Sequence, residues 1–164
     1  LIFYLTRTSK PRIVAIAPRV RENERQFKNV ALHNLAECPQ LKIIRIDGSL
    51  FFGAGEHVGN TLEEIIEEGY NHVLIVAQGV NFMDISGAEL LVNYAKKFKA
   101  NGGGLYLCAL NKTVRDFMKQ GGYREAFGEE NLFINKELAI EDIYARLDAS
   151  ICEQCTARVF QECK

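Results

Sequence analysis

The chain has 164 residues, 48% hydrophobic and 25% charged, so it is long enough for one globular domain whose core needs no disulfide or metal. Its formal net charge of −1, without a run of basic residues, excludes the strongly basic surface of a nucleic-acid-binding protein. The five cysteines follow no secretory signal, so we expect a reducing compartment.

The first half of the chain predicts two short strands and one helix. Residues 13–17 are β-branched and bounded by prolines, and residues 41–46 form a second strand that residues 49–52 extend past an Asp-Gly turn signal. Residues 19–40 between the strands are polar with weak helical spacing, which predicts a connector. In residues 56–68 the apolar positions recur at helical spacing, so we expect a helix there.

The second half predicts alternating strands and helices. Residues 73–77 are apolar at every position, which is typical of a strand covered on both faces. A helix begins after Asp84 and stops at the glycines 102–104, and further strands are expected at 105–110 and 132–134. Two asparagines cap the remaining predicted helices, at 111–118 and 135–147. This order predicts an α/β domain with helices packed on the sheet.

The leading candidate site is the stretch MDISG, which follows a buried strand and a short loop and stands where a helical pattern begins. Asp84 is placed as an N-cap that accepts hydrogen bonds from the amides of Ser86 and Gly87. Ser86 would lie in the first helical turn, where a phosphate gains from the helix dipole and is repelled by Asp84. A plain helix cap explains the same residues, so both interpretations stay open.

A second candidate is the stretch FFGAGEHVG. Gly53 and Gly55 lie between a strand and a helix, as in a dinucleotide-binding loop, but Val58 stands where a third glycine is needed. A tight strand-to-helix turn is the competing interpretation, so these glycines are only a weak candidate for a nucleotide or anion loop. The three histidines are isolated from one another and from any nucleophile, so we predict neither an enzyme nor a cofactor.

The remaining pattern is CEQCTARVFQEC, with Cys152, Cys155 and Cys163. Three thiolates are suited to zinc, an iron–sulfur cluster or a disulfide, but tetrahedral zinc takes four ligands and no histidine lies nearby. A solvated tail with incidental thiols is the competing interpretation. Cys108, inside an apolar run, is predicted to be a small core residue.

The stretch GVNFMDISGAELL resembles the signature segment of the STAS domain, shared by bacterial anti-sigma-factor antagonists and the cytoplasmic tails of SulP anion permeases. In the antagonists a partner kinase phosphorylates the serine directly before the signature glycine, and that position is Ser86 here. Ile85 stands where the family usually has Ser or Thr. The resemblance implies an α/β STAS-like fold, a small mixed sheet of about four to five strands flanked by about four helices.

Two further stretches resemble the SulP branch. IIRIDGSLFFGAGEHV looks like the SulP segment in which an Arg-hydrophobe-Asp-Gly strand leads to a Phe-Phe turn and a helix. LIFYLTRTSKPRIVAIAPRV resembles the junction between the last membrane helix and the STAS domain. The resemblance therefore implies a membrane-helix stub and linker at residues 1–10, a STAS domain at 11–149 and a cysteine-containing tail at 150–164.

By this resemblance the chain is the regulatory domain of a SulP transporter for an anion such as sulfate or bicarbonate, at the cytoplasmic face of the inner membrane. Its implied partners are the membrane transport domain of the same polypeptide, a second copy in a homodimer of the full-length transporter, and a regulatory protein or kinase that reads Asp84, Ser86 and Gly87. The alternative is a soluble anti-sigma-factor antagonist, a phosphorylatable partner switch. A nucleotide-binding domain is a third class, which rests on Gly53 and Gly55 alone.

Overall fold

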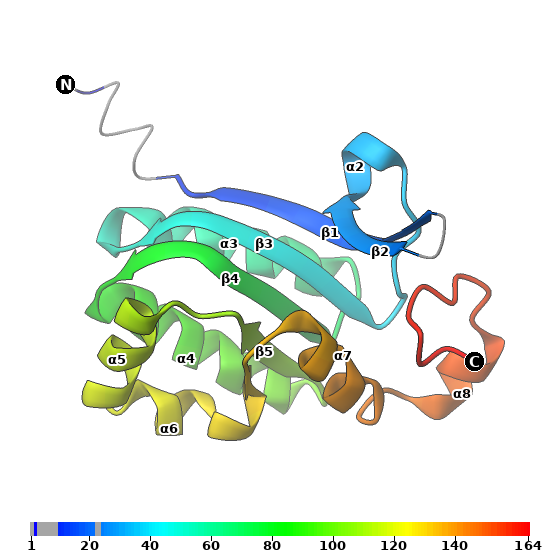
Figure 1. The fold of residues 1–164 in the computed structure, drawn as a ribbon. Helices are drawn as coiled ribbons and strands as arrows, with labels where there is room; N and C mark the ends of the chain where they lie inside the picture. The colour runs from blue at the N-terminus through cyan, green and yellow to red at the C-terminus, as the bar shows by residue number, and fades with distance from the viewer. Residues whose placement is uncertain (1, 3–9, 22–23) are drawn as a thin grey trace.

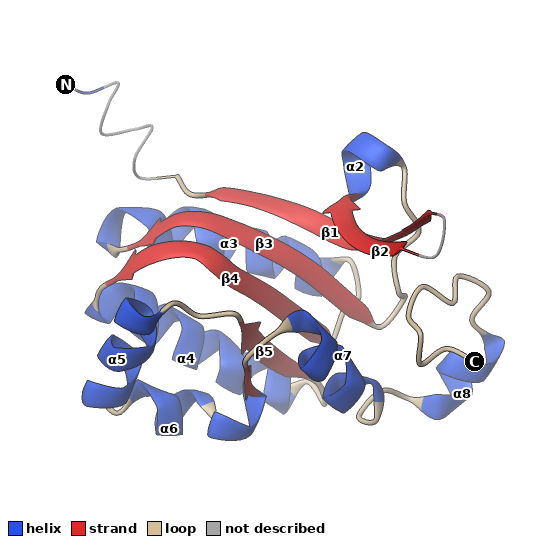
Figure 2. Ribbon diagram, in the orientation of Figure 1, coloured by secondary structure: helices blue, strands red, loops and turns tan. Residues whose placement is uncertain are grey.

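The structure, a computed structural model, describes residues 2, 10–21 and 24–164, which form one mixed sheet with helices on both faces (Figures 1 and 2). The strands are β1 (Arg12–Arg21), β2 (Glu24–Asn29), β3 (Leu41–Leu50), β4 (His72–Met83), β5 (Gly104–Cys108) and β6 (Leu132–Phe133). The α-helices are α2 (Val30–His33), α3 (Gly55–Glu67), α4 (Ile85–Ala100), α5 (Lys112–Gln120), α6 (Tyr123–Phe127), α7 (Lys136–Tyr144) and α8 (Ala149–Gln154). Two 3₁₀ turns complete the fold, η1 (Phe52–Ala54) and η2 (Glu129–Asn131).

The strand order is β2-β1-β3-β4-β5-β6. Strand β1 runs antiparallel to β2 and β3, whereas β3 to β6 are parallel, so the carboxyl ends of these four strands meet at one edge of the sheet. The predicted mixed α/β fold is confirmed, with six strands and seven α-helices in the described residues rather than four to five strands and four helices.

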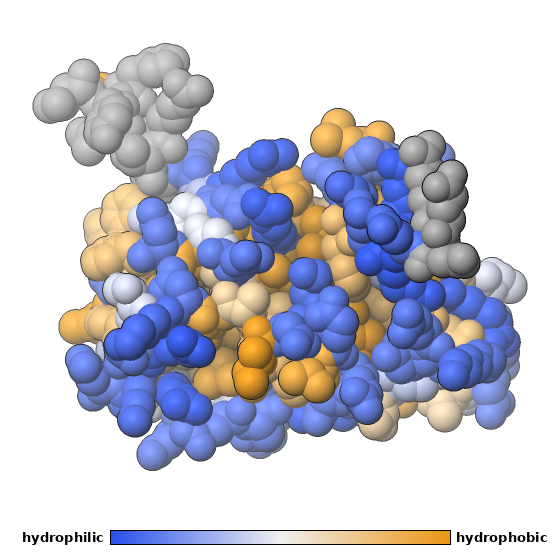
Figure 3. All heavy atoms as spheres, viewed as in Figure 1, coloured by the Kyte–Doolittle hydropathy of each residue, from blue (hydrophilic) through white to orange (hydrophobic). Residues whose placement is uncertain are grey.

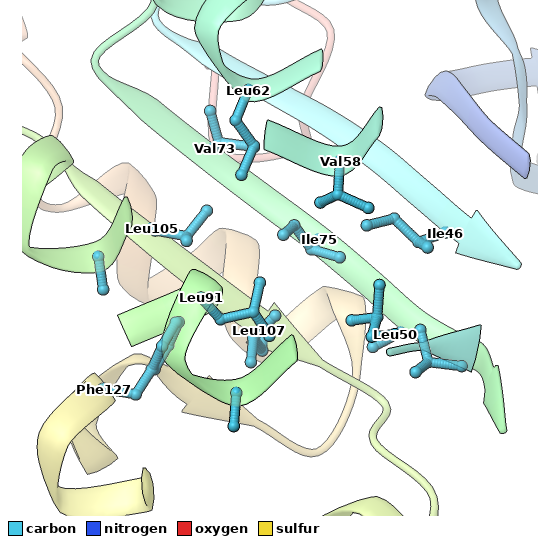
Figure 4. Packing of buried hydrophobic residues seen from close by; sticks show 14 of the residues in the cluster. Ile46, Leu50, Val58, Leu62, Val73, Ile75, Leu91, Leu105, Leu107 and Phe127 are labelled. Atoms are coloured by element: carbon cyan, nitrogen blue, oxygen red, sulfur yellow. The ribbon is translucent and has the colours of Figure 1, made fainter. Parts of the chain in front are cut away.

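One face of the sheet packs against α3, α4, α5 and α6. Figure 4 shows Val58 of α3 close to Ile46 and Ile75 of the sheet, and Leu91 of α4 beside Leu107 of β5. All of these side chains are almost completely removed from solvent, and burial of this kind is the main favourable contribution to folding. The apolar stripe of α4, which includes Leu91, Ala95 and Phe98, therefore faces the core.

The opposite face packs against α7 and the segment that follows it. Leu74 and Val76 point into this second cluster, whereas Val73 and Ile75 point into the first, which explains why the strand is apolar at every position. Cys108 lies fully buried in the second cluster, and burial raises the pKa of its thiol to about 12. The expectation that Cys108 is a core residue is confirmed.

The connector predicted at residues 19–40 is wrong, because β1 continues through Pro18 and a second strand and a short helix follow it. Strand β1 pairs with β3 only over residues 12–15, and Pro18 pairs on one side with Phe27 of β2. Proline lacks a backbone N–H, so it is tolerated where only one side of a strand is paired. A proline in the predicted terminating position therefore does not end this strand.

Strand β4 is longer than predicted and runs on to Met83. Gly79 permits the extension, because a Cβ at this position would lie 1.8 Å from Oδ1 of Asp47 on the neighbouring strand. Strand β3 likewise continues through the Asp47-Gly48 turn signal, with register shifts on both sides of Gly48 that absorb the irregularity. The helices α6 and α8 were not predicted, since five and six residues are too few to show a helical period.

The membrane-helix stub predicted at residues 1–10 lies outside the described residues, apart from Ile2 and Lys10. Within the part of the chain that the structure describes, no helix combines the length and the hydrophobicity that crossing a membrane requires. The predicted boundaries at residues 10 and 150 stay predictions.

We expect Leu91→Ala to lower the free energy of unfolding by about 3 kcal/mol, because it leaves a cavity beneath α4 at a fully buried position. Urea unfolding followed by circular dichroism measures this change. Glu89→Ala, an exposed residue of the same helix, is the matched control and should change stability by less than about 0.5 kcal/mol. Equal losses in the two variants would contradict the packing of α4 described above.

Candidate functional site

The candidate site is built on the Asp84 carboxylate. Asp84 is the N-cap of α4, and its Oδ1 accepts a hydrogen bond from the Gly87 amide at 2.9 Å. Its Oδ2 accepts from the amide of Phe52 at 3.0 Å, not from Ser86 as the sequence suggested. A helix cap bonds only to the amides of its own helix. The Asp84 carboxylate in addition joins the start of α4 to the turn after β3.

Gly87 brings the first turn of α4 against the end of β3. A Cβ at this position would lie 2.3 Å from the carbonyl oxygen of Leu50, and the Asp84 amide donates to that same oxygen at 3.0 Å. A side chain here would push the helix away from the strand. The glycine at position 87 is therefore required by the close packing of α4 against the backbone of β3.

Ser86 is exposed, and its hydroxyl has no hydrogen-bond partner among the described residues. Three apolar side chains near it are also unusually exposed: Phe52 at 83%, Ile85 at 58% and Phe82 at 49%. We call these four residues the Ser86 surface. Figure 3 shows hydrophobic side chains at the left end of the molecule, where α3 and α4 begin. Exposed aromatic and aliphatic side chains that gather at one place are typical of an interaction surface.

The chain enters the fold at the same edge of the sheet. Arg12, the first residue of β1, pairs with Asp47 near the end of β3. Nε2 of His57, in the first turns of α3, donates to the Pro11 carbonyl oxygen at 3.1 Å. Whatever precedes Pro11 is therefore attached close to the Ser86 surface.

Gly53 and Gly55 form a tight turn. Gly53 lies within η1 and Gly55 begins α3, where a Cβ would meet no atom within 4 Å. The charged groups beside this turn are the carboxylates of Glu56 in the first turn of α3 and of Asp84, and both disfavour an anion. Gly55 has an ordinary helical φ of −59°, so neither its backbone nor a close contact requires a glycine there, and the nucleotide or anion loop stays a prediction.

The three cysteines near the end of the chain are free thiols. Sγ of Cys152 accepts a hydrogen bond from Nε2 of Gln40 at 3.2 Å, while Cys155 follows α8 and Cys163 packs at the margin of the second cluster. Burial, with Cys163 and Cys155 nearby, raises the pKa of the Cys152 thiol and makes it a weaker nucleophile at neutral pH. Among the described residues no three His, Cys, Asp or Glu side chains are grouped to hold a metal ion.

One polar cluster was missed by sequence reasoning. His72, treated as isolated, is only 8% exposed, and its Nδ1 lies 2.9 Å from the hydroxyl of Tyr106 on the neighbouring strand. Arg146 lies over the Tyr106 ring, 5.4 Å from its centroid. Burial and the positive charge of Arg146 both lower the pKa of His72, so the imidazole is neutral near pH 7. His72 and Tyr106 both fall near predicted strands, but nothing in the sequence ties Arg146 to them.

Comparison with known proteins identifies the family to which this chain belongs. A protein-family model described as the STAS domain matches residues 33–139, well over half of the chain. The chain belongs to the STAS domain family. The matched segment contains the whole of β3, β4 and α4, and hence the Asp84 cap and the Ser86 surface.

Relatives of this STAS domain include transporters. The chain is 24% identical over 97 residues to a putative sulfate transporter, YvdB, of Bacillus subtilis (strain 168); the match covers 59% of this chain and 18% of that protein. Its fold resembles that of the murine Slc26a9 anion transporter with a TM-score of 0.73 and 18% identity, covering 88% of this chain and 24% of the other. The STAS domain thus spans less than a third of either relative.

Two separate STAS-type structures have the same fold. The STAS domain of a SulP transporter from Vibrio cholerae has a TM-score of 0.54 at 23% identity, covering 73% of this chain and 94% of the other. The anti-sigma factor antagonist SpoIIAA has a TM-score of 0.56 at 20% identity, covering 69% of this chain and 96% of the other. At such low identity the likeness concerns the fold alone and does not separate the two functional branches.

We expect Gly87→Ala to destabilise the STAS domain by about 2 kcal/mol, because the new Cβ collides with the Leu50 carbonyl and α4 has to shift. Thermal and urea unfolding measure this loss. Ser86→Ala, at the exposed neighbouring position, is the control and should change stability by less than about 0.5 kcal/mol. If Gly87→Ala were as stable as the wild type, the close approach of α4 to β3 would be wrong.

His72 makes stability depend on pH. Because its pKa is lowered in the folded domain, the unfolded chain binds the proton more readily, and stability is lost as the pH falls below about 6.5. The loss from this one proton is at most about 1.4 kcal/mol per pH unit. Urea unfolding at several pH values from neutral downward measures it, and His72→Gln should flatten the dependence.

The control for the pH experiment is His33→Gln, because His33 is exposed and its Nδ1 accepts only from the Arg19 guanidinium. This variant should keep the pH dependence of the wild type. A His72→Gln protein whose stability still falls as steeply as that of the wild type would show that another group is responsible.

Proposed function

We propose that this STAS domain is the cytoplasmic regulatory part of a SulP-type anion transporter whose membrane domain moves an inorganic anion such as sulfate or bicarbonate. In this proposal the domain catalyses no reaction and needs no cofactor. It acts through the Ser86 surface, which a partner contacts. The observation that carries the proposal is the exposure of Phe52, Phe82 and Ile85 around a serine hydroxyl that has no hydrogen-bond partner in the described part of the chain.

The cap supports a regulatory role for Ser86, because it holds the hydroxyl in a defined place. The Asp84 carboxylate holds the start of α4 to the Phe52 amide of η1, and Gly87 packs against the Leu50 carbonyl of β3, so a partner meets the Ser86 surface without having to order it first. A phosphate on Ser86 would add charge beside three apolar side chains and the Asp84 carboxylate. The like charge and the cost of desolvating the phosphate would both weaken an apolar contact.

The relatives support the transporter assignment. The curated relative is named a putative sulfate transporter, and the Slc26a9 chain is described as an anion transporter; this chain matches a minor share of each. In this proposal a membrane domain precedes residue 10 in the same polypeptide. Two copies of the full-length transporter would then form a homodimer. The transported anion is part of the proposal.

The experiment that tests this assignment is fractionation of the native cells with an antibody raised against this domain. We expect the antigen in the membrane fraction, in a species far larger than the 18.5 kDa of this chain. A soluble antigen near 18.5 kDa would instead favour the anti-sigma-factor antagonist, a partner switch for which the SpoIIAA-like fold and the position of Ser86 are the supporting observations.

In the full-length transporter we expect Ser86→Asp to change anion uptake at least about threefold, since a charge at this position alters an apolar contact by roughly 1 kcal/mol. Ser86→Ala should leave uptake near the wild-type rate while removing the response to any kinase. Uptake of radiolabelled sulfate and bicarbonate into vesicles, corrected for the amount of transporter, measures the effect. Thr113→Asp, at an exposed position of α5, is the control that adds the same charge elsewhere. Unaltered uptake and assembly in both Ser86 variants would refute the switch.

A further inference from the structure

A pocket of about 480 Å³ lies at the amino ends of the parallel strands, the opposite edge of the sheet from Ser86. It is bounded by the starts of β4 and β5, the end of α4, α6 with η2, and the segment after α7. We propose that this pocket binds a small phosphorylated organic molecule. This inference does not rest on the function proposed above, because binding here requires neither a membrane domain nor a partner at Ser86.

The first observation is His72 in the pocket wall. Its side chain is more than nine-tenths buried, yet only Nδ1 has a hydrogen-bond partner among the described residues, the Tyr106 hydroxyl. Among the described residues, the one fully buried side-chain N or O atom that lacks a partner is Oε2 of Glu37. Nε2 of His72 also lacks a partner in the described chain, so it must be partly accessible, and it is accessible from the pocket that His72 lines. Buried polar atoms normally have partners, and a nitrogen held open in this way is suited to a ligand.

The neighbours of His72 determine which ring nitrogen carries the proton. Burial raises the pKa of Tyr106, while the positive charge of Arg146, which lies 5.4 Å from the centroid of the Tyr106 ring, acts in the opposite direction. A guanidinium has no acceptor, so the Tyr106 hydroxyl proton is free to point at Nδ1 of His72. The neutral imidazole then carries its own proton on Nε2, which makes it a donor into the pocket.

Two glycines where β5 begins, Gly103 and Gly104, keep the part of the pocket beside His72 open. A Cβ on Gly104 would lie 2.5 Å from the Tyr106 hydroxyl, so a side chain there would displace the group that holds His72. A Cβ on Gly103 would lie 1.7 Å from the carbonyl oxygen of Asn71. The triple glycine that ends α4 in the sequence therefore also shapes the pocket.

Charges on the walls indicate the class of ligand. Lys96 and Lys99, three residues apart on α4, line the pocket, and neither forms an ion pair with another described residue. Arg146 lines it too, although Asn131, Asp142 and the Glu130 carbonyl already accept from its guanidinium. Two free ammonium groups and the donor on Nε2 of His72 match a doubly charged phosphate ester better than a carboxylate.

Two carboxylates in the pocket wall require hydrogen-bond donors on the ligand. Glu125 and Glu130 line the pocket, and their carboxylates form no ion pair with the described residues. They repel a bare anion and accept hydrogen bonds from hydroxyl or amino groups. The volume is also many times the roughly 30 Å³ share of one water molecule, so an inorganic ion alone would leave most of the pocket filled with solvent. A phosphate ester of a polyhydroxy compound satisfies both walls.

The experiment titrates the domain with ribose 5-phosphate while the histidine ring signals are followed by ¹H–¹³C NMR. The three histidines are assigned from single variants, and we expect a saturable shift at His72 with a Kd in the millimolar range or below, while His33 and His57 stay unmoved. Unphosphorylated ribose should produce no saturable shift. Inorganic phosphate should bind more weakly than the sugar phosphate.

Lys96→Gln/Lys99→Gln should weaken the binding about tenfold, because two charge contacts to the phosphate are lost. These lysines have no partners in the described residues, so the double variant folds normally, which thermal unfolding verifies. Lys119→Gln/Lys164→Gln removes two exposed lysines outside the pocket and is the control for net charge. An unmoved His72 signal, equal weakening in both double variants, or equal binding of ribose, would each overturn the proposal.

Discussion

The fold around the Ser86 surface depends on how the Asp84 carboxylate is shared. One oxygen caps α4 and the other holds the Phe52 amide, so the helix on β4 and the turn after β3 are fixed to each other by a single side chain. Gly87 adds the close approach that lets α4 lie against the Leu50 carbonyl. With the backbone held in this way, the side chains at the edge are free to face solvent.

Strand β4 carries contrasting chemistry at its two ends. Its carboxyl end leads to exposed aromatic and aliphatic residues, whose exposure is unfavourable in water and is relieved by a partner. Its amino end begins with a buried imidazole beneath free ammonium groups, where polar groups are open to a solute. Because the strand between them is packed on both faces, the two ends are parts of one rigid element.

The sequence was informative wherever a local pattern determined the structure. The apolar strand at residues 73–77, the helix after Asp84 and the cap at Asp84 follow from local pattern and capping, and all three are present in the structure. The hairpin of β1 and β2 was missed because Pro18 reads as a terminator, and only its place on one side of the sheet makes it acceptable. Partners distant in sequence, such as Phe52 for Asp84 and Arg146 for Tyr106, have no local signal.

The contact of Pro11 with His57 has a consequence for how partners reach this domain. A group attached through residues before Pro11 is confined to the neighbourhood of the edge where α3 and α4 begin, so its effective concentration there is set by the length of the tether. With a short flexible tether that concentration is in the millimolar range. A contact with Phe52, Phe82 and Ile85 whose Kd lies below that concentration would then be mostly formed, and a freely diffusing competitor would need a higher affinity to displace it.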